Sequence, residues 1–187
     1  LKTKYGNQQK SSGTKKYTQL QKRFDLLLRA FKRARLKDFS LIILGDGSLK
    51  KDLMELALNL GLQESVIFTG YVKNPYYYYK KASAFIMCSD FEGSPNALWE
   101  ALSLGAPSIV SNRVKEALIH LENAKSARII EGGNVNALSD ALIEFSEDQN
   151  LAKILRENGP KVVEKFSIAE INKKWDKILF GADYHAD

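Results

Sequence analysis

The sequence predicts an α/β domain with a Rossmann-like, doubly wound parallel sheet and helices on both faces. Short apolar runs alternate along the chain with helical segments of about ten residues or more. The short runs are apolar throughout, which is typical of parallel strands buried on both faces. Glycine or proline often follows where a run or a helical segment ends, as expected at the turns between such elements.

Side chains at helical or strand spacing define the elements of the first half. We expect, in order, a helix over 24–35, a strand over 41–44, a helix over 49–60, a strand over 66–68, a short helix after Pro75 and a strand over 84–88. Gly61 should end the second helix. The four tyrosines at 76–79 should place alternate rings in the core, although aromatics beside lysines also suit membranes or nucleic acid.

The second half continues the same alternation. We expect a helix over 96–104, strands over 107–110 and 128–130, and helices over 135–145, 151–158 and 168–179. Gly159-Pro160 should break the helix that begins at Leu151. Ser167 and Glu170 form a capping box for the last helix. Trp99 and Trp175 are most simply core aromatics.

Composition limits the class of protein. The 187 residues fit one soluble domain, and no apolar run approaches the roughly 18 residues needed to span a bilayer. No secretory signal is visible, so we expect a cytoplasmic location. Cys88 is the only cysteine, which rules out an internal disulfide and a zinc cluster; it should be a small hydrophobe inside a strand.

Positive charge is concentrated near the start of the chain. Residues 1–37 carry twelve Lys or Arg and one acid, a net charge of +11, whereas the remainder carries −5. Ligand phosphates, an anionic membrane surface or nucleic acid could each explain this, as could a solvated arm over residues 1–15. Of these partners we do not expect nucleic acid. A peripheral contact with the inner face of the membrane stays open.

The segment over 89–102 carries the chemistry. It follows a predicted strand, and Ser94 as N-cap with Pro95 as first helical residue would start a helix at the ligand edge of the sheet. The unpaired N–H groups there suit a diphosphate. Glu92 precedes this helix and Glu100 lies inside it, so the two carboxylates should grip separate parts of one ligand, such as sugar hydroxyls.

Glu92 and Glu100, with seven residues between them, resemble the paired glutamates of family 4 retaining glycosyltransferases with the GT-B fold (glycosyl transferases group 1). The surrounding residues 92–111, the segment 22–27, the turn over 44–47 and the strand and turn over 66–70 resemble that family too, in order. The likeness covers roughly 20–180. It implies the C-terminal, donor-nucleotide-binding domain over 20–187, with residues 1–19 a basic polar arm or a remnant of the first strand.

The resemblance also implies roles for individual residues. Glu92 would contact the transferred sugar, Glu100 the ribose, and Lys22 the leaving diphosphate. The other donor-binding positions it implies are Gly93, Ser94, Asn96 and Ala97 in the loop and helix start, Gly45 and Gly47 near the nucleotide, and Tyr71 and Val72 near the base. The donor would be a UDP-linked hexose or N-acetylhexosamine, the acceptor a glycan or glycolipid, and no cofactor or metal is expected.

Departures and simpler alternatives stay open. Lys15 or Lys16 stands near the family's arginine, residues 112–116 replace its glycine-rich turn, and the acceptor domain that would precede residue 20 is missing. Glu100 could be a surface carboxylate, Lys22 one of many lysines, and 45–47 only a turn. A non-catalytic nucleotide- or partner-binding module, as half of a split enzyme, is the alternative function; an epimerase is less favoured, because its acid–base groups are not evident.

Overall fold

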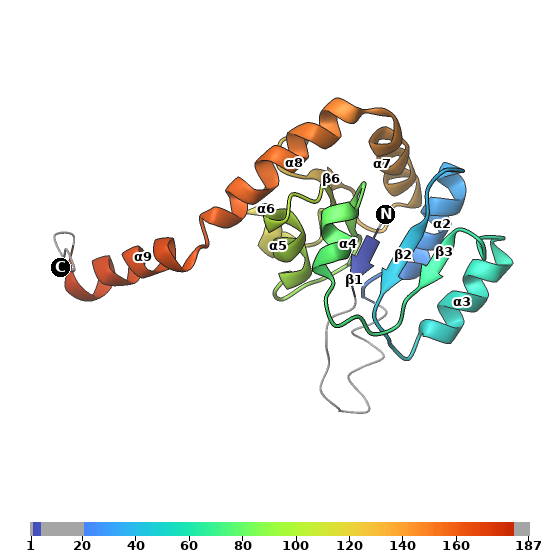
Figure 1. Cartoon of the computed structure of the whole chain (residues 1–187), viewed down its shortest axis with the longest axis horizontal. Coiled ribbons are helices and arrows are strands. Elements are labelled where there is room, and N and C mark those ends of the chain that lie inside the picture. The colour runs from blue at the N-terminus through green and yellow to red at the C-terminus, as the bar shows by residue number, and fades with distance from the viewer. Residues whose placement is uncertain (1, 5–20, 182–187) are drawn as a thin grey trace.

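The computed structural model describes residues 2–4 and 21–181 and shows a single six-stranded parallel sheet (Figure 1). The strand order is β3-β2-β1-β4-β5-β6, the order of the classical dinucleotide-binding sheet. The strands are β1 (Lys2–Lys4), β2 (Leu41–Leu44), β3 (Val66–Phe68), β4 (Phe85–Met87), β5 (Ser108–Ser111) and β6 (Arg128–Ile130). The predicted fold class is therefore confirmed.

Helices cover both faces of this sheet. They are α2 (Phe24–Ala34), α3 (Lys50–Asn59), α4 (Tyr76–Lys81), α5 (Asn96–Ser103), α6 (Lys115–Leu118), α7 (Val135–Glu147) and α8 (Gln149–Glu164). The last helix, α9 (Ile168–Phe180), buries none of its residues and does not cover the sheet. The short helix α6 was not predicted. Within the described part of the chain, no helix is both long and apolar enough to cross a membrane.

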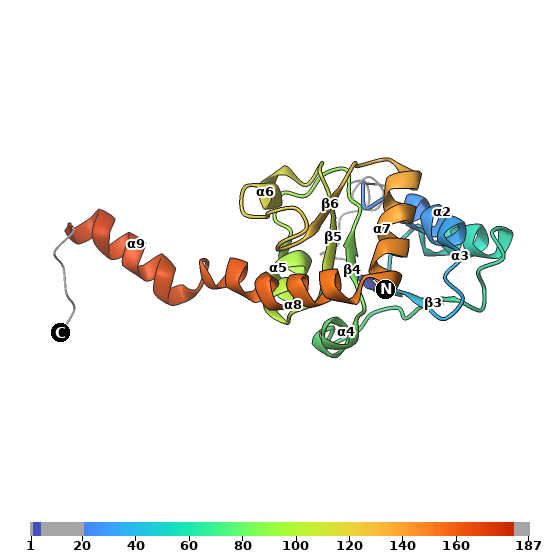
Figure 2. The same cartoon turned by 90° about the horizontal axis from the view of Figure 1, so that it is seen from above.

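Each central strand divides its side chains between two hydrophobic cores. Ile86 of β4 belongs to the core under α2, α3 and α7, whereas its neighbours Phe85 and Met87 belong to the core under α4, α5 and α6. Helix α8 crosses from one core to the other, because Leu155 lies in the first and Val162 in the second. Figures 1 and 2 show α8 running past α7 and α5. Two-sided burial explains the uninterrupted apolar runs.

The strand order reverses between β1 and β4. Strands to one side of this point are β2 and β3, and strands to the other side are β5 and β6. In an open α/β sheet, the crevice at the carboxyl ends of the strands beside such a reversal is where ligands bind. The loop after β4, which contains residues 88–95, lies at this position.

The central strand β1 differs from our expectation. We expected an arm over residues 1–15 and the remnant of the first strand near 15–20, but Lys2–Lys4 pairs in parallel with both β2 and β4. The Lys-Thr-Lys triplet has no apolar run, so hydrophobic pattern could not reveal it. Residues 15–20 lie outside the described part of the chain.

Helix α8 also differs, because it continues through Gly159-Pro160 to Glu164. Proline cannot donate to the carbonyl of Arg156, and this oxygen faces Gly105, where an added Cβ would lie only 3.2 Å away. Gly159 packs against Leu102 of α5, with an added Cβ 3.1 Å from the Leu102 Cδ2. Packing against α5 thus holds the helix together across the proline.

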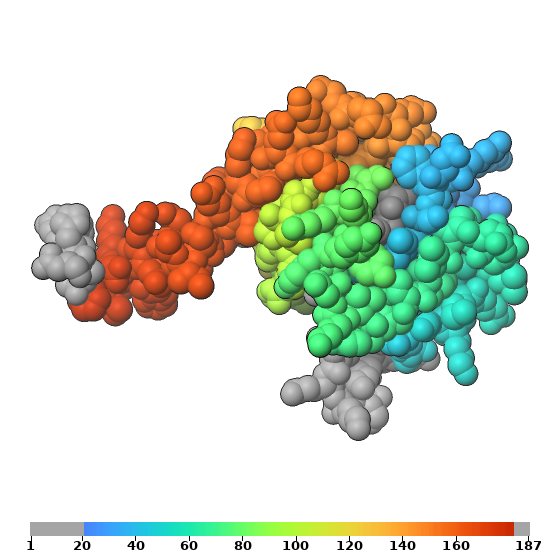
Figure 3. Space-filling model, viewed as in Figure 1, coloured from blue at the N-terminus to red at the C-terminus, as the bar shows by residue number. Residues whose placement is uncertain are grey.

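The predicted last helix is confirmed as α9, but its apolar face is exposed. Ser167 caps it by accepting a hydrogen bond of 3.3 Å from the Glu170 N–H. None of its residues is buried, and Trp175 is 55% exposed, so the core position expected for Trp175 is wrong. Figures 1 and 3 show α9 projecting away from the body of the domain. Trp99, by contrast, packs half-buried against the core.

The tyrosine run forms the predicted short helix, but only part of the packing prediction holds. Tyr79 is fully buried and packs edge-to-face on Phe85, with ring centroids 5.6 Å apart. Tyr77, which alternation would place beside it, is 66% exposed. In a helix, residues two positions apart lie on opposite sides, so only one ring of such a pair can reach the core.

Replacing Asn134 with alanine is expected to lower the free energy of unfolding by about 1 kcal/mol. The Asn134 side chain caps α7 by accepting hydrogen bonds from the N–H groups of Asn136 and Ala137. Urea denaturation measures the loss, and Asn136→Ala, at an exposed position in the first turn, is the matched control. Equal stabilities of the two variants would contradict the capping role.

Candidate functional site at the carboxyl edge of the sheet

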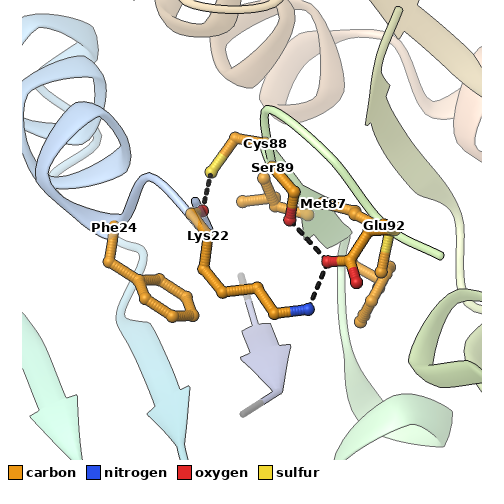
Figure 4. A pocket seen from close by; sticks show the side chains of 8 residues that line it. Lys22, Phe24, Met87, Cys88, Ser89 and Glu92 are labelled. Carbon is orange, nitrogen blue, oxygen red and sulfur yellow. Dashed lines mark hydrogen bonds and ion pairs between the residues drawn. The ribbon is translucent and has the colours of Figure 1, made fainter. Parts of the chain in front are cut away.

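Lys22 and Glu92 form an ion pair at the carboxyl end of β4 (Figure 4). The Lys22 Nζ donates to Glu92 Oε1, and the Ser89 hydroxyl donates to the same oxygen at 2.7 Å. Their side chains are only 16% and 7% exposed. The structure therefore brings together the two residues predicted to be catalytic, although they are 70 positions apart. It pairs them with each other in a small pocket that Phe24 and Met87 also line.

Main-chain contacts hold the segment before α2 against the loop after β4. The Asp90 N–H donates to the Gln21 carbonyl at 2.8 Å, and the Cys88 thiol lies 3.4 Å from the carbonyl oxygens of Lys22 and Arg23. Burial raises the pKa of Cys88 to about 12, so the thiol stays protonated and can donate. This supports the structural role predicted for Cys88 and fixes the backbone of Lys22.

Asp90 lies between two arginines that the sequence analysis did not identify. Arg113 NH1 contacts Asp90 Oδ1 at 2.6 Å, and Arg23 NH1 contacts Asp90 Oδ2 at 3.1 Å. The hydrogen bond to Asp25 is the main cause that raises the pKa of Arg23, and Asp90 adds to it. The strand order could have identified this cluster from the sequence. Asp90 follows β4 and Arg113 follows the adjacent parallel strand β5, so both lie at the carboxyl edge of the sheet.

The start of α5 differs by one residue from the prediction. Pro95 is the N-cap and Asn96 the first helical residue, whereas Ser94 was expected as N-cap. The Ser94 hydroxyl is engaged elsewhere, because it donates to the Asn96 side-chain oxygen at 2.9 Å. Gly93, Ser94, Asn96 and Ala97, the positions predicted to bind the donor, lie in the loop and first helical turn directly after Glu92. Gly93 and Asn96 are exposed.

Glu100 lies in a different surrounding from Glu92. It is half-buried in α5, and it does not line the pocket formed by Lys22 and Glu92. Burial raises the pKa of the Tyr79 hydroxyl, and the negative charge of Glu100 raises it further, which places that carboxylate beside α4. The two glutamates thus lie in separate surroundings. That arrangement is compatible with each binding a different part of one ligand, but Glu92 and Glu100 do not line the same pocket.

Two turns beside β2 and β3 contain the remaining predicted positions. Gly45, at a φ of 110°, donates its N–H to the Gly70 carbonyl at 2.7 Å and so ties the two strand ends together. The Gly47 carbonyl accepts from the Lys50 N–H and begins α3. Tyr71 is 67% exposed and Val72 is half-buried, so Tyr71 offers a free ring.

The charged groups of these turns are held mainly by local pairs. Lys50 contacts Asp46 at 2.8 Å, and this hydrogen bond is the main cause that lowers the pKa of Asp46. Over residues 2–4 and 21–181, no three His, Cys, Asp or Glu side chains are grouped closely enough to hold a metal ion.

Comparison with known proteins places this chain in a family. Residues 13–162 match the family described as Glycosyl transferases group 1, and the chain belongs to it. It is 32% identical over 157 residues to an N-acetylgalactosamine-N,N'-diacetylbacillosaminyl-diphospho-undecaprenol 4-alpha-N-acetylgalactosaminyltransferase of Campylobacter jejuni. The alignment covers 83% of this chain and 42% of that relative. The chain thus spans less than half the length of this relative.

Solved structures confirm the fold. The chain resembles HepE of Anabaena, crystallised with UDP, with a TM-score of 0.81 at 16% identity over 97% of this chain and 48% of that one. It also resembles the C-terminal domain of the group 1 glycosyl transferase LpcC of Francisella tularensis, with a TM-score of 0.74 at 17% identity over 89% and 86%. The fold is that found in GT-B glycosyltransferases, as the sequence resemblance predicted.

Proposed function

We propose that this chain is the donor-binding half of a retaining glycosyltransferase that takes a hexose or N-acetylhexosamine from a UDP-linked donor. The observation that supports this best is the Lys22–Glu92 ion pair at the carboxyl end of β4, directly before the loop and helix α5. A nearly buried ammonium group beside a carboxylate, at the edge where α/β sheets bind ligands, suits a substrate with both diphosphate and hydroxyl groups.

In the proposed mechanism, donor binding rearranges this pair. Lys22 neutralises charge that develops on the departing diphosphate, and Glu92 accepts hydrogen bonds from hydroxyls of the transferred sugar. Gly93 is exposed, and backbone N–H groups of this loop, such as that of Gly93, add further donors for the diphosphate. Glu92 orients the sugar and is not a covalent nucleophile, while the leaving phosphate helps to deprotonate the acceptor in a front-face displacement.

The remaining proposed contacts are for the nucleotide. Glu100 accepts hydrogen bonds from the ribose hydroxyls, and the exposed ring of Tyr71 lies with Val72 near the base. Gly45 and Gly47 let the backbone approach the nucleotide. The name of the Campylobacter relative describes transfer to a diphospho-undecaprenol-linked sugar, and HepE was crystallised with UDP. These names favour a UDP-sugar donor and a glycolipid acceptor for this chain.

The acceptor and the membrane contact are part of the same proposal. The acceptor domain would be supplied by further chain or by a separate subunit, because the chemistry of a two-domain enzyme takes place in the cleft between its domains. The whole protein would work in the cytoplasm, peripherally at the inner face of the membrane, where a lipid-linked acceptor is presented. The basic segment over 1–37 favours contact with anionic lipid.

Glu100→Ala is expected to weaken UDP binding by about 1.5–3 kcal/mol, because it removes charge-assisted hydrogen bonds to the ribose. Isothermal titration of UDP into both proteins measures the difference. Glu157→Ala, at an exposed position on α8, is the matched control and should bind like the parent. Equal, weak binding by all three proteins would overturn the proposed nucleotide site.

A second candidate function is a non-catalytic module that binds a partner. The exposed apolar face of α9, which includes Trp175 and Ile178, favours it. Size-exclusion chromatography with mass measurement separates the two: a monomer that binds UDP supports the transferase half, and a dimer indifferent to UDP supports the binding module.

A further inference from the structure

A second cavity adjoins the loop that follows Glu92. It has a volume of about 440 Å³, within the range of pockets that hold small molecules. Four segments meet in its wall: the loop over 93–95, Trp99 of α5, the α6 region with Glu116 and His120, and the segment with Val163 at the end of α8 and Phe166 just after it. None of the roles proposed above uses Trp99, Glu116, His120 or Phe166.

Aromatic rings form one wall of this cavity. The His120 ring packs edge-to-face on Phe166 with centroids 4.5 Å apart, and Trp99 lies 5.5 Å from Phe166 and 6.1 Å from His120. Because each ring contacts the other two, the wall is formed before any ligand arrives. Phe166 and Trp99 are half-buried and His120 is exposed, so ring surface is available at the opening.

One residue of the cavity wall, Glu116, has a buried carboxylate oxygen without a partner among the described residues. Glu116 Oε2 is buried and accepts no hydrogen bond from the described part of the chain. A buried carboxylate oxygen without a donor is costly, and a rotation of the Glu116 side chain toward the cavity would let a ligand hydroxyl remove that cost. The described lining includes no Lys or Arg, so a phosphate group would meet a carboxylate without a cation to offset it.

We infer that this cavity binds a pyranose ring, and that the ring belongs to the acceptor. Sugar hydroxyls donate hydrogen bonds to a carboxylate, and the C–H faces of a pyranose pack on aromatic rings. The assignment of this ring to the acceptor rests on the proposed function, whereas the binding of a pyranose does not. The position fits, because Gly93 of the cavity wall directly follows Glu92, and an acceptor hydroxyl must be held close to the transferred sugar.

Trp99 provides the test, because it lines the cavity and Trp175 is the only other tryptophan. In the Trp175→Phe chain, titration with methyl α-D-N-acetylgalactosaminide is expected to give a saturable change in Trp99 emission with a millimolar Kd. The change should persist when UDP or the intact UDP-sugar is saturating. Loss of the change with the UDP-sugar but not with UDP would overturn the acceptor assignment, because the ring would then be the donor's.

Variants test the residues of the cavity. Glu116→Gln and His120→Ala should each weaken glycoside binding by about fivefold or more, roughly the value of one hydrogen bond or ring contact. Glu122→Gln is the control, because Glu122 is exposed and pairs with Lys125 at 2.7 Å. Circular dichroism checks that each variant is folded.

Three results would overturn the inference: no saturable change, the same Kd in all variants, or binding of tetramethylammonium, a cation that aromatic rings also hold, without binding of the glycoside. The UDP titration with Glu100→Ala is independent of these outcomes. A chain that binds the glycoside but not UDP would keep the pyranose site and lose the proposed transferase function, and the reverse result would lose only the pyranose site.

Discussion

Lys22→Met is expected to lower the free energy of unfolding by about 3 kcal/mol. The substitution leaves the Glu92 carboxylate, whose side chain is 7% exposed, with the hydrogen bond from the Ser89 hydroxyl but without the lysine charge. Removing one member of a nearly buried pair costs more than the pair contributes, because the other charge stays desolvated. Urea denaturation of the parent and variant chains measures the loss.

A double-mutant cycle separates this charge effect from lost packing. Adding Glu92→Gln to Lys22→Met removes the unpaired charge, so the double variant should recover much of the stability lost by the single one. Lys50→Met is the matched control, because Lys50 pairs with Asp46 in a more exposed position, with 31% and 59% of the side chains exposed. Little change is expected there. A Lys22 variant as stable as the Lys50 variant would show that the buried pair is not formed.

The same variants connect stability with the proposed function. If Lys22 neutralises a diphosphate, Lys22→Met should also weaken UDP binding, whereas Lys50→Met should not. Glu92→Gln alone should leave or improve UDP affinity, because Lys22 then has no competing carboxylate. This pattern distinguishes a ligand site from a purely structural ion pair, for which the three variants would bind UDP alike.

Most of the sheet and its helices could be predicted, because most strands are short, continuous apolar runs and the helices have apolar residues at helical spacing. Leu41–Leu44 and Val66–Phe68 are continuous apolar runs, and both are strands with the predicted bounds. The polar strand Lys2–Lys4 could not be predicted, because it is held by backbone pairing on both sides rather than by an apolar pattern. The course of α8 through Pro160 depends on packing against α5, which is not visible in a local pattern.

The candidate site was predictable where motif and topology agree. Lys22 and Glu92, both predicted for the site, lie together because β4 ends beside the segment that begins α2. Their ion pair with each other was not predicted. Arg113 was missed as a site residue, since its position across the edge from Asp90 follows from the order of β4 and β5 rather than from spacing. Trp175 was misplaced because a helical apolar face shows that a helix is amphipathic but not what covers it.

Gly132→Ala is expected to cost about 3 kcal/mol of folding free energy, through overpacking at a position that has no room. An added Cβ would lie 2.6 Å from Arg113 Cγ and closer still to the Ser111 hydroxyl. Ser111 is fully buried in β5 and cannot move away, and the Gly132 N–H is held by the Asn112 side chain at 2.9 Å. Arg113 must therefore shift.

Displacement of Arg113 would reach the site, because the same side chain contacts Asp90 at 2.6 Å. Gly93→Ala is the matched control: an added Cβ there meets nothing within 4 Å, so the fold should keep its stability. Guanidinium denaturation compares the two alanine variants. A Gly132→Ala chain as stable as Gly93→Ala would mean that Arg113 is free to move, and that the Arg113–Asp90 contact does not fix the edge of the sheet beside Glu92.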